Sequence, residues 1–368
     1  MKRKLSTALV MLLAFVLLIG TTAITASAET TYRPIGGSTS FMKNLVVDAD
    51  ANIPDVTFSY TIKRGTPVAA TADTIEILVS DTDDEDTIGT AAFSNTDATY
   101  RTADNKKYAQ KAVLINLPKT SFTKPGVYRY EITEETDNPL PGVTYDPDSI
   151  RYLDVFVVAD ESNVLDVQNY VFRKAATNIG LDGKYVSNPN EKSSGYINTL
   201  TQYDFEFSKT ISGNQGDKNK RFNFTLNITG ANPGVYPVKT NDVTTNDETG
   251  NPPTSITVGA DGKATGEYLL TNGSTVKVIG LNEGAVCTVT EDPDDYTATH
   301  SLDSDTAVSG NSSGNVILNS DHSVAFTNTR NGIIPTGIIM TIAPFAIGIC
   351  VFGAVFIFII VRRKRRSY

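Results

Sequence analysis

The sequence predicts an all-β protein of two tandem domains, and three observations lead to this prediction. Short runs such as "DVTFSYTIK", "RYLDVFVV" and "STVKVIG" alternate apolar and polar residues, and turn residues separate these runs. No stretch outside the two apolar chain ends has a helical pattern. Finally, a Lys, a Glu and an Asn recur in the same order and in similar local contexts in the two halves of the chain.

The N-terminal end has the three parts of a secretory signal peptide. A basic start precedes an apolar centre, and the small residues Ala26, Ser27 and Ala28 close the segment. A retained membrane anchor is the alternative, but the small-residue end favours cleavage after Ala28. We therefore expect residues 1–28 to be removed during export.

The C-terminal end combines a short motif, an apolar span and a basic tail. Residues 338–361 carry no charge and are numerous enough to cross a bilayer as a helix. The basic tail, residues 362–368, is expected on the cytoplasmic side. A lipid-anchor signal fits less well, because such a signal ends in an apolar tail. The five residues directly before the span are Ile333, Ile334, Pro335, Thr336 and Gly337.

This order of motif, span and tail resembles the sorting signal of Gram-positive surface proteins, whose usual motif is L-P-x-T-G. The resemblance implies that a sortase cuts between Thr336 and Gly337 through a cysteine thioester, and that an amine then takes over the Thr336 carbonyl. Ile333 and Ile334 replace the usual Leu and Pro. This departure is similar to variants in pilins that have a dedicated sortase, and it leaves the class of sortase open.

The composition of the expected exported chain, residues 29–336, limits its partners. The removed ends carry eight basic and no acidic residues, so the formal charge falls from −9 to −9 − 8 = −17. Such an acidic chain is unsuited to nucleic acid. Cys350 lies in the apolar span, which leaves Cys287 alone and excludes an internal disulfide. Covalent stabilisation would therefore need another chemistry.

The internal repeat is defined by local context rather than by distance. Its members are Lys43 in "SFMKNLVV", Glu134 in "GVYRYEITEE", Asn198 in "GYINTL", Lys209 in "FEFSKTIS", Glu291 in "GAVCTVTED" and Asn328 in "VAFTNTR". Asn198 and Lys209 are only 209 − 198 = 11 positions apart, which places a domain junction near residues 199–204. We therefore expect domains at residues 29–200 and 201–332.

These six contexts resemble the streptococcal T-antigen-type (FctA-like) backbone pilins, and the resemblance continues into the sorting signal. It implies two immunoglobulin-like β-sandwich domains of the collagen-adhesin B type (CnaB-type). It also implies an autocatalytic isopeptide bond in each domain, with Glu134 and Glu291 as the catalytic residues. The implied bonds are Lys43–Asn198 and Lys209–Asn328.

The residue types suit this chemistry. Burial lowers the pKa of a Lys, which makes the neutral amine available, and it raises the pKa of a neighbouring Glu, which can then polarise an Asn carbonyl. Strand alternation predicts that Phe41 and Leu45 share the inward face with Lys43. In the second copy, Phe205 and Phe207 share a face with Lys209. Any one of these charged residues alone would more often be an exposed edge charge.

A polymerising pilin also needs an exposed Lys whose amine resolves the thioester of the next subunit. By the same resemblance this residue is Lys192 in "NPNEKSSGYIN", with Lys184 as the second candidate. A solvated loop lysine is the alternative interpretation for both.

The resemblance implies a secreted protein that is anchored to the cell wall within a pilus, and whose precursor resides transiently in the plasma membrane. The implied partners are a sortase, other copies of the chain, ancillary pilins, peptidoglycan and a host surface ligand. No cofactor and no metal are expected, since "DTDDED" lacks the Gly and Glu of an EF-hand loop.

Two other classes remain open. A monomeric wall-anchored adhesin or an ancillary pilin could use the same domains. A surface enzyme is a weaker alternative, because Cys287 and His300 form the only Cys–His combination of the exported chain that the sequence suggests, and nothing in the sequence orients them. Cys287 is expected to pack as a small apolar residue.

Overall fold

The computed structural model describes residues 31–80, 86–187, 191–244 and 251–332. Over these ranges the chain consists of strands and turns, which confirms the all-β fold class for this part. Within the same ranges there is no helix of the length and apolarity that a membrane span requires. The expected signal peptide, sorting motif, transmembrane helix and basic tail lie outside the described residues.

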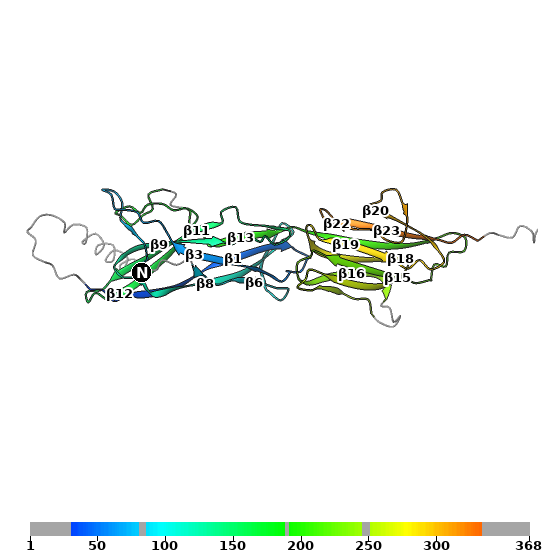
Figure 1. Cartoon of the computed structure of the whole chain (residues 1–368), viewed down its shortest axis with the longest axis horizontal. Helices are drawn as coiled ribbons and strands as arrows, with labels where there is room; N and C mark the ends of the chain where they lie inside the picture. Colours follow the sequence, from blue (N-terminus) through cyan, green and yellow to red (C-terminus); the bar gives the residue numbers. More distant parts are fainter. Residues whose placement is uncertain (1–30, 81–85, 188–190, 245–250, 333–368) are drawn as a thin grey trace, which may run out of the picture.

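The first β body occupies the blue-to-green end of the molecule and is a sandwich of two main sheets (Figure 1). One sheet has the order β10-β13-β1-β8-β7, and its strands in that order are Val143–Thr144, Gly195–Leu200, Ile35–Asp48, Lys106–Phe122 and Thr99–Ala103. The other has the order β12-β11-β9-β3-β5, with strands Leu165–Arg173, Ile150–Ala159, Gly126–Glu134, Tyr60–Arg64 and Asp86–Thr87. The short strand β4 (Ile77–Leu78) runs parallel to β9, while β2 (Val56–Phe58) pairs with β6 (Ala91–Phe93).

The second β body is built around one long strand, β18 (Ala264–Asn282). The first half of β18 pairs with β15 (Phe222–Thr229) and its second half with β14 (Gln202–Ser212), so this strand connects both halves of a single large sheet. The sheet order is β21-β20-β23-β14-β18-β15-β19-β22, with β16 and β17 attached. Its remaining strands are β16 (Gly234–Thr244), β17 (Ser255–Val258), β19 (Val286–Glu291), β20 (Thr297–Leu302), β21 (Val308–Ser309), β22 (Val316–Ile317) and β23 (His322–Thr329).

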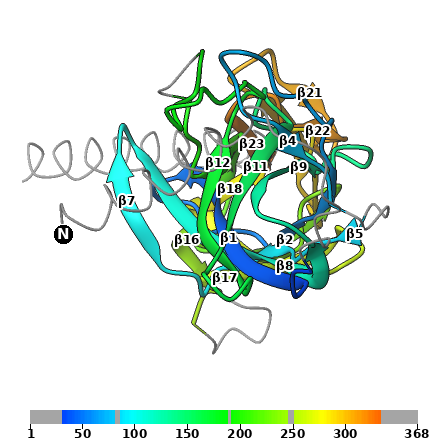
Figure 2. The ribbon, with the colours of Figure 1, turned by 90° about the vertical axis from the view of Figure 1, so that its left-hand side faces the viewer.

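Each body encloses its own hydrophobic core. Figure 2 looks along the molecule from the side of the first body, with β8 below and β9 and β11 above. Phe41 and Leu45 are buried together with Lys43, as alternation predicts. The corresponding residues of β14 are buried in the same way. Apolar neighbours therefore carry both lysines into the interior.

The two bodies lie end to end, and the chain passes from one to the other through a single residue, Thr201, between β13 and β14 (Figure 1). The Gln202 side chain connects them, since its Oε1 accepts from the Asp48 amide at 3.1 Å and its Nε2 donates to the Gly280 carbonyl at 2.7 Å. The Asp55 amide donates to the carbonyl of Pro233 at 2.7 Å. These bonds satisfy backbone groups of both bodies at the junction.

Gly195 is required where β1 and β13 come together beside Lys43. Its φ is +143°, and a Cβ built there would lie 1.7 Å from the carbonyl oxygen of Met42. We expect Gly195→Ala to lower the free energy of unfolding of the first body by about 1–3 kcal/mol or more, because both strain and a backbone clash result. Chemical denaturation measures the effect. Gly273→Ala is the control, since Gly273 also has positive φ (+92°) but nothing within 4 Å of its Cβ position. Equal losses of unfolding free energy in the two variants would contradict a clash with the Met42 carbonyl oxygen.

Candidate functional site

In both bodies the first and last strands place the Lys and the Asn in the same relative position. Strands β1 and β13 run parallel, and Lys43 pairs with the residue two positions before Asn198. Strands β14 and β23 also run parallel, and Lys209 pairs with the residue two positions before Asn328. Because strand side chains alternate, this offset puts Lys and Asn on the same face of neighbouring strands.

The first cluster brings together the three residues predicted for the first domain. Lys43 Nζ donates to Glu134 Oε1 at 2.5 Å, and Asn198 Nδ2 donates to the same oxygen at 3.1 Å. All three side chains are buried, with residue exposures of at most 1%. The Tyr60 hydroxyl adds a third donor to this oxygen at 3.1 Å, and the Phe58 ring lies 4.4 Å from the Lys43 amine.

The second cluster repeats this arrangement. Lys209 Nζ donates to Glu291 Oε1, and Asn328 Nδ2 donates to the same oxygen at 2.6 Å. These three residues are equally buried. The ring of Phe222 lies 4.4 Å from the Lys209 amine, as Phe58 does in the first cluster. In each body a buried carboxyl group therefore lies between an amine and a carboxamide.

The carboxyl groups enter from strands that do not pair with the Lys and Asn strands. Glu134 ends β9 and lies opposite Tyr60 of β3. Glu291 ends β19 and lies opposite Phe224 of β15. The first glutamate thus has a hydroxyl partner on the neighbouring strand, whereas the second has an aromatic ring without one.

Burial changes the protonation of the reacting groups. Loss of solvation lowers the pKa of Lys43 and of Lys209 from 10.5 to about 8, although each neighbouring Glu opposes the change. At neutral pH this shift raises the neutral fraction of each amine by about 300-fold. Burial raises the pKa of Glu291, with hydrogen bonds from Lys209 and Asn328 opposing it. In the second cluster burial therefore shifts both the amine and the carboxyl group towards their neutral forms.

Aromatic residues beside each cluster were not predicted from the sequence: Phe58 and Tyr60 in the first and Phe222 and Phe224 in the second. Phe58 and Tyr60 alternate in "FSY", and Phe222 and Phe224 alternate in "FNF". Both pairs precede the glutamate in the chain and follow the lysine. The signal that could have identified these aromatic pairs is a repeated pattern. After each strand that contains the Lys, two aromatic residues occur two positions apart.

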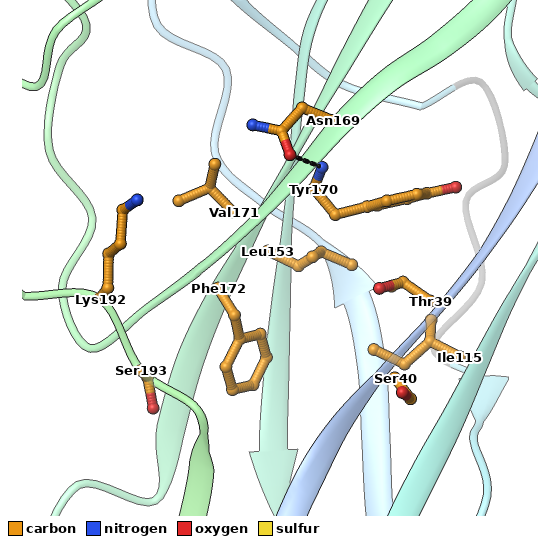
Figure 3. Close-up of a pocket in the computed structure, with 10 residues that line it drawn as sticks. All are labelled: Thr39, Ser40, Ile115, Leu153, Asn169, Tyr170, Val171, Phe172, Lys192 and Ser193. Atoms are coloured by element: carbon orange, nitrogen blue, oxygen red, sulfur yellow. Dashed lines mark hydrogen bonds between the residues drawn. The ribbon is translucent and has the colours of Figure 1, made fainter. Parts of the chain in front are cut away.

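The two candidate lysines for subunit linkage lie at the surface. Lys192 is exposed, and its segment extends the edge of β12, since the Ser193 amide donates to the Phe172 carbonyl at 2.8 Å. Lys192 and Ser193 form one side of a hollow of about 270 Å³, and Thr39, Ser40 and Ile115 lie on the other (Figure 3). Lys184 is also exposed, but its amine forms an ion pair with Asp182 at 3.0 Å.

The Cys–His combination is not arranged as a catalytic pair. Cys287 is fully buried, and burial raises the pKa of its thiol to about 12. The His300 ring packs against Phe326, and its Nδ1 lies 3.3 Å from the carbonyl oxygen of Gly310. In the described residues no group of three His, Cys, Asp or Glu side chains could hold a metal ion.

Comparisons with known proteins define the class of this chain. Residues 39–186 match the family model described as "Spy0128-like isopeptide containing domain", and residues 203–330 match a domain of unknown function, DUF7601. These matches and the relatives described next confirm the resemblance to FctA-type pilins. Its similarity to these pilins makes the chain a structural backbone subunit of a surface pilus.

The particular relatives are streptococcal. A protein named "Pilin" from Streptococcus pyogenes serotype M1 is 27% identical over 358 residues, which cover 93% of this chain and 97% of the relative. The crystal structure of the major pilin from Streptococcus pyogenes matches with a TM-score of 0.52 at 23% identity, over 80% of this chain and 99% of that one. The T3.2 major pilin of that species matches with a TM-score of 0.50 at 18% identity and the same coverage. The structural matches support the fold.

Proposed function

We propose that this backbone pilin crosslinks itself once in each domain and is then joined covalently to the next subunit by a sortase. The two buried Lys–Glu–Asn clusters, formed in the same parallel register, carry this proposal. An exposed or isolated lysine would be protonated and unreactive towards an amide. Two independent lysines buried against both a carboxyl and a carboxamide favour a chemical role over an accidental one.

The crosslinking step needs no external reactant. The neutral amine of Lys43 or Lys209 attacks the Cγ of the facing Asn, and the carbonyl electrons move onto Oδ1. One proton of the attacking amine passes through the Glu carboxyl to the Asn Nδ2. Collapse of the intermediate re-forms the carbonyl and expels ammonia, so an amine and a carboxamide become an isopeptide bond. Fixed placement of the reactants on neighbouring strands supplies much of the acceleration, up to roughly 7–11 kcal/mol.

Polymerisation would join the sorting motif of one copy to an exposed lysine of another. A sortase would cut between Thr336 and Gly337, and the exposed Lys192 amine of another copy would resolve the resulting thioester. The hollow beside Lys192 supports this assignment, because it offers space next to the amine (Figure 3). Lys184 remains the second candidate. The final subunit would be joined to peptidoglycan in the wall.

A monomeric adhesin or an ancillary pilin, the other classes that the sequence leaves open, would use the same domains to present a surface for a host ligand. The internal crosslinks do not separate these functions, because both would benefit from them. The presence of covalent multimers distinguishes a backbone subunit from a monomeric adhesin. A backbone subunit gives a ladder of regularly spaced masses in wall extracts, whereas an adhesin gives one band.

The intact mass of residues 29–336, produced without sortase, tests the crosslinks. Both cores lie inside this part of the chain. We expect a mass below that of the plain sequence by two molecules of ammonia, because each cluster expels one. Glu134→Ala and Glu291→Ala should each restore one ammonia. A mass equal to that of the plain sequence would rule out the crosslinks, while the pilin fold would stand.

A further inference from the structure

We propose that the two domains form their crosslinks with different electrostatic assistance. In the first domain the backbone N–H of Asp146 serves as an oxyanion donor. In the second domain the described residues give Asn328 Oδ1 no such donor, and the reaction depends on the acid form of Glu291. This inference rests on the proposed crosslinking. It assigns a catalytic group to the first domain, and a positioning role to the residue that holds it, Arg151.

The contact that carries the proposal is a hydrogen bond to the reacting carbonyl. The Asp146 amide nitrogen lies 2.8 Å from Asn198 Oδ1 and donates to it in the interior of the first body. Amine attack on Asn198 places negative charge on this oxygen. A fixed donor at this distance stabilises such charge, and removal of one such donor typically costs about 100-fold or more in rate.

The turn that presents this donor is held from two sides. The Asp146 carboxylate accepts from the Ile197 amide at 3.1 Å and from Arg151 Nη2 at 2.8 Å. Arg151 is fully buried, donates to the Asp148 carbonyl through Nη1, and stacks on the Tyr196 ring at 4.7 Å. A buried charge held by so many partners indicates a rigid turn.

The second domain contains the same turn in a different place. Asp146-Pro147-Asp148 and Asp292-Pro293-Asp294 share a sequence, and in each the third residue's amide donates to the first Asp side chain, at 3.1 and 3.2 Å. In the first domain the turn begins 146 − 134 = 12 residues after the glutamate, but in the second it follows at once, 292 − 291 = 1.

The position of the turn decides where its backbone N–H points. The Asp292 amide donates to the Asn223 carbonyl at 2.9 Å and not to the reactive Asn. Among the described residues, Asn328 Oδ1 is buried and has no hydrogen-bond partner, unlike Asn198 Oδ1. The second carboxyl oxygen of each glutamate, Glu134 Oε2 and Glu291 Oε2, has no partner either. A proton on Glu291 is the donor that remains close to Asn328, with which Glu291 already shares a hydrogen bond.

Both glutamates accept from their Lys and Asn through Oε1, and they differ in one further contact. Glu134 Oε1 also accepts from the Tyr60 hydroxyl, so three donors surround this oxygen. In the first domain the Asp146 N–H polarises the carbonyl while Glu134 takes the proton of the amine and passes it to Nδ2. In the second domain the Glu291 carboxyl polarises the carbonyl by donating a hydrogen bond to Oδ1. As ammonia leaves, the carboxyl passes this proton to Nδ2 and takes one from the attacking amine nitrogen in its place.

The pH dependence of crosslinking separates these two arrangements. In the second domain the reactive state pairs a neutral Lys209 with a protonated Glu291; as the pH rises above about 8, the pair loses this proton and the rate falls by about tenfold per pH unit. A backbone N–H does not titrate. The first-domain rate should therefore rise to a plateau as the Lys43 amine becomes neutral.

The surrounding charges do not reverse this expectation. The titratable and charged groups that act on the first cluster are Lys43, Glu134, Tyr60, Tyr145, Asp146, Arg151 and Tyr196, and those that act on the second are Lys209, Glu291 and Asp292. Burial raises the pKa of Tyr60 and of Tyr196 far above the range tested. The Asp146 pKa stays low, because hydrogen bonds from Arg151 and two backbone amides outweigh its burial.

The experiment starts from unreacted, denatured residues 29–336 recovered from inclusion bodies. The protein is refolded by dilution at pH values from about 7 to about 9.5, quenched in acid and digested, and the two crosslinked peptides are quantified from the same sample. We expect the ratio of first-domain to second-domain rate to increase by at least about tenfold over this range. Parallel profiles would overturn the proposal, whereas absence of both crosslinked peptides would instead refute the proposed function.

A matched pair of variants tests the donor itself. Asp146→Pro removes both the N–H and the carboxylate, and Asp146→Ala removes only the carboxylate. We expect first-domain crosslinking to be about 100-fold slower in the Pro variant than in the Ala variant, with second-domain crosslinking unchanged as the internal reference. Equal first-domain rates would overturn the assignment. If the Pro variant does not fold, a scalar coupling across the hydrogen bond from the Asp146 amide to Asn198 Cγ in the unmutated protein decides: its presence supports the donor and its absence overturns it.

Discussion

Glu291→Ala is expected to lower the free energy of unfolding of the second body by about 5 kcal/mol, because the Lys209–Asn328 crosslink would no longer form. A crosslink between these residues closes a loop that spans 328 − 209 = 119 positions. Treated as a disulfide of the same loop length, such a bond removes about 5 kcal/mol of chain entropy from the unfolded state. The variant also leaves the Lys209 amine buried without its acidic partner, which adds to the loss.

Calorimetry of residues 29–336 measures this effect, since the two bodies have separate cores and can unfold in separate transitions. The transition of the first body serves as the reference. Glu283→Ala is the matched control, because Glu283 is exposed in the same body and its removal touches no cluster. The mass of Glu291→Ala shows whether the Lys209–Asn328 crosslink is missing. If it is missing and the unfolding temperature of the second body is unchanged, the crosslink contributes little to stability.

Strand alternation was sufficient to predict which way the reactive side chains point. Phe41, Lys43 and Leu45 are alternate residues of one strand and therefore lie on the same face. Burial of the two apolar side chains turns this face towards the core. The order Lys, Glu, Asn then predicted which strands meet. The offset of two residues between Lys and Asn was not predictable, because it depends on the parallel register of β1 with β13, which no local pattern encodes.

Two other parts of the site could not be predicted from the sequence, for a different reason. Asp146 is functional through its backbone, and a backbone N–H leaves no signature in residue type. Its placement depends on the length of the segment between β9 and β11, which brings the turn beside Asn198. Tyr60 was not predictable as part of the site, because an aromatic residue in a strand ordinarily indicates only core packing. Its hydroxyl contact with Glu134 depends on strand pairing.

Lys192→Arg is expected to abolish the covalent ladder while leaving the monomer folded and internally crosslinked. A guanidinium stays protonated at physiological pH and cannot resolve a thioester, yet it preserves the charge and most of the length of the lysine. The side chain is exposed, and within the described part of the chain it has no hydrogen bond or ion pair, so the substitution should not disturb the fold. Electrophoresis of wall extracts under denaturing conditions, from cells with the cognate sortase, reads the ladder directly.

Lys184→Arg is the matched control and should polymerise as the unmutated chain does, because the Lys184 amine is held by Asp182 and lies outside the hollow beside Lys192. The reverse result, with the ladder lost in Lys184→Arg and kept in Lys192→Arg, would move the linkage to Lys184. A ladder that survives both substitutions would exclude both lysines as the acceptor. The intact mass of each monomer separates these outcomes from misfolding, since a misfolded first body would also retain the ammonia of its own crosslink.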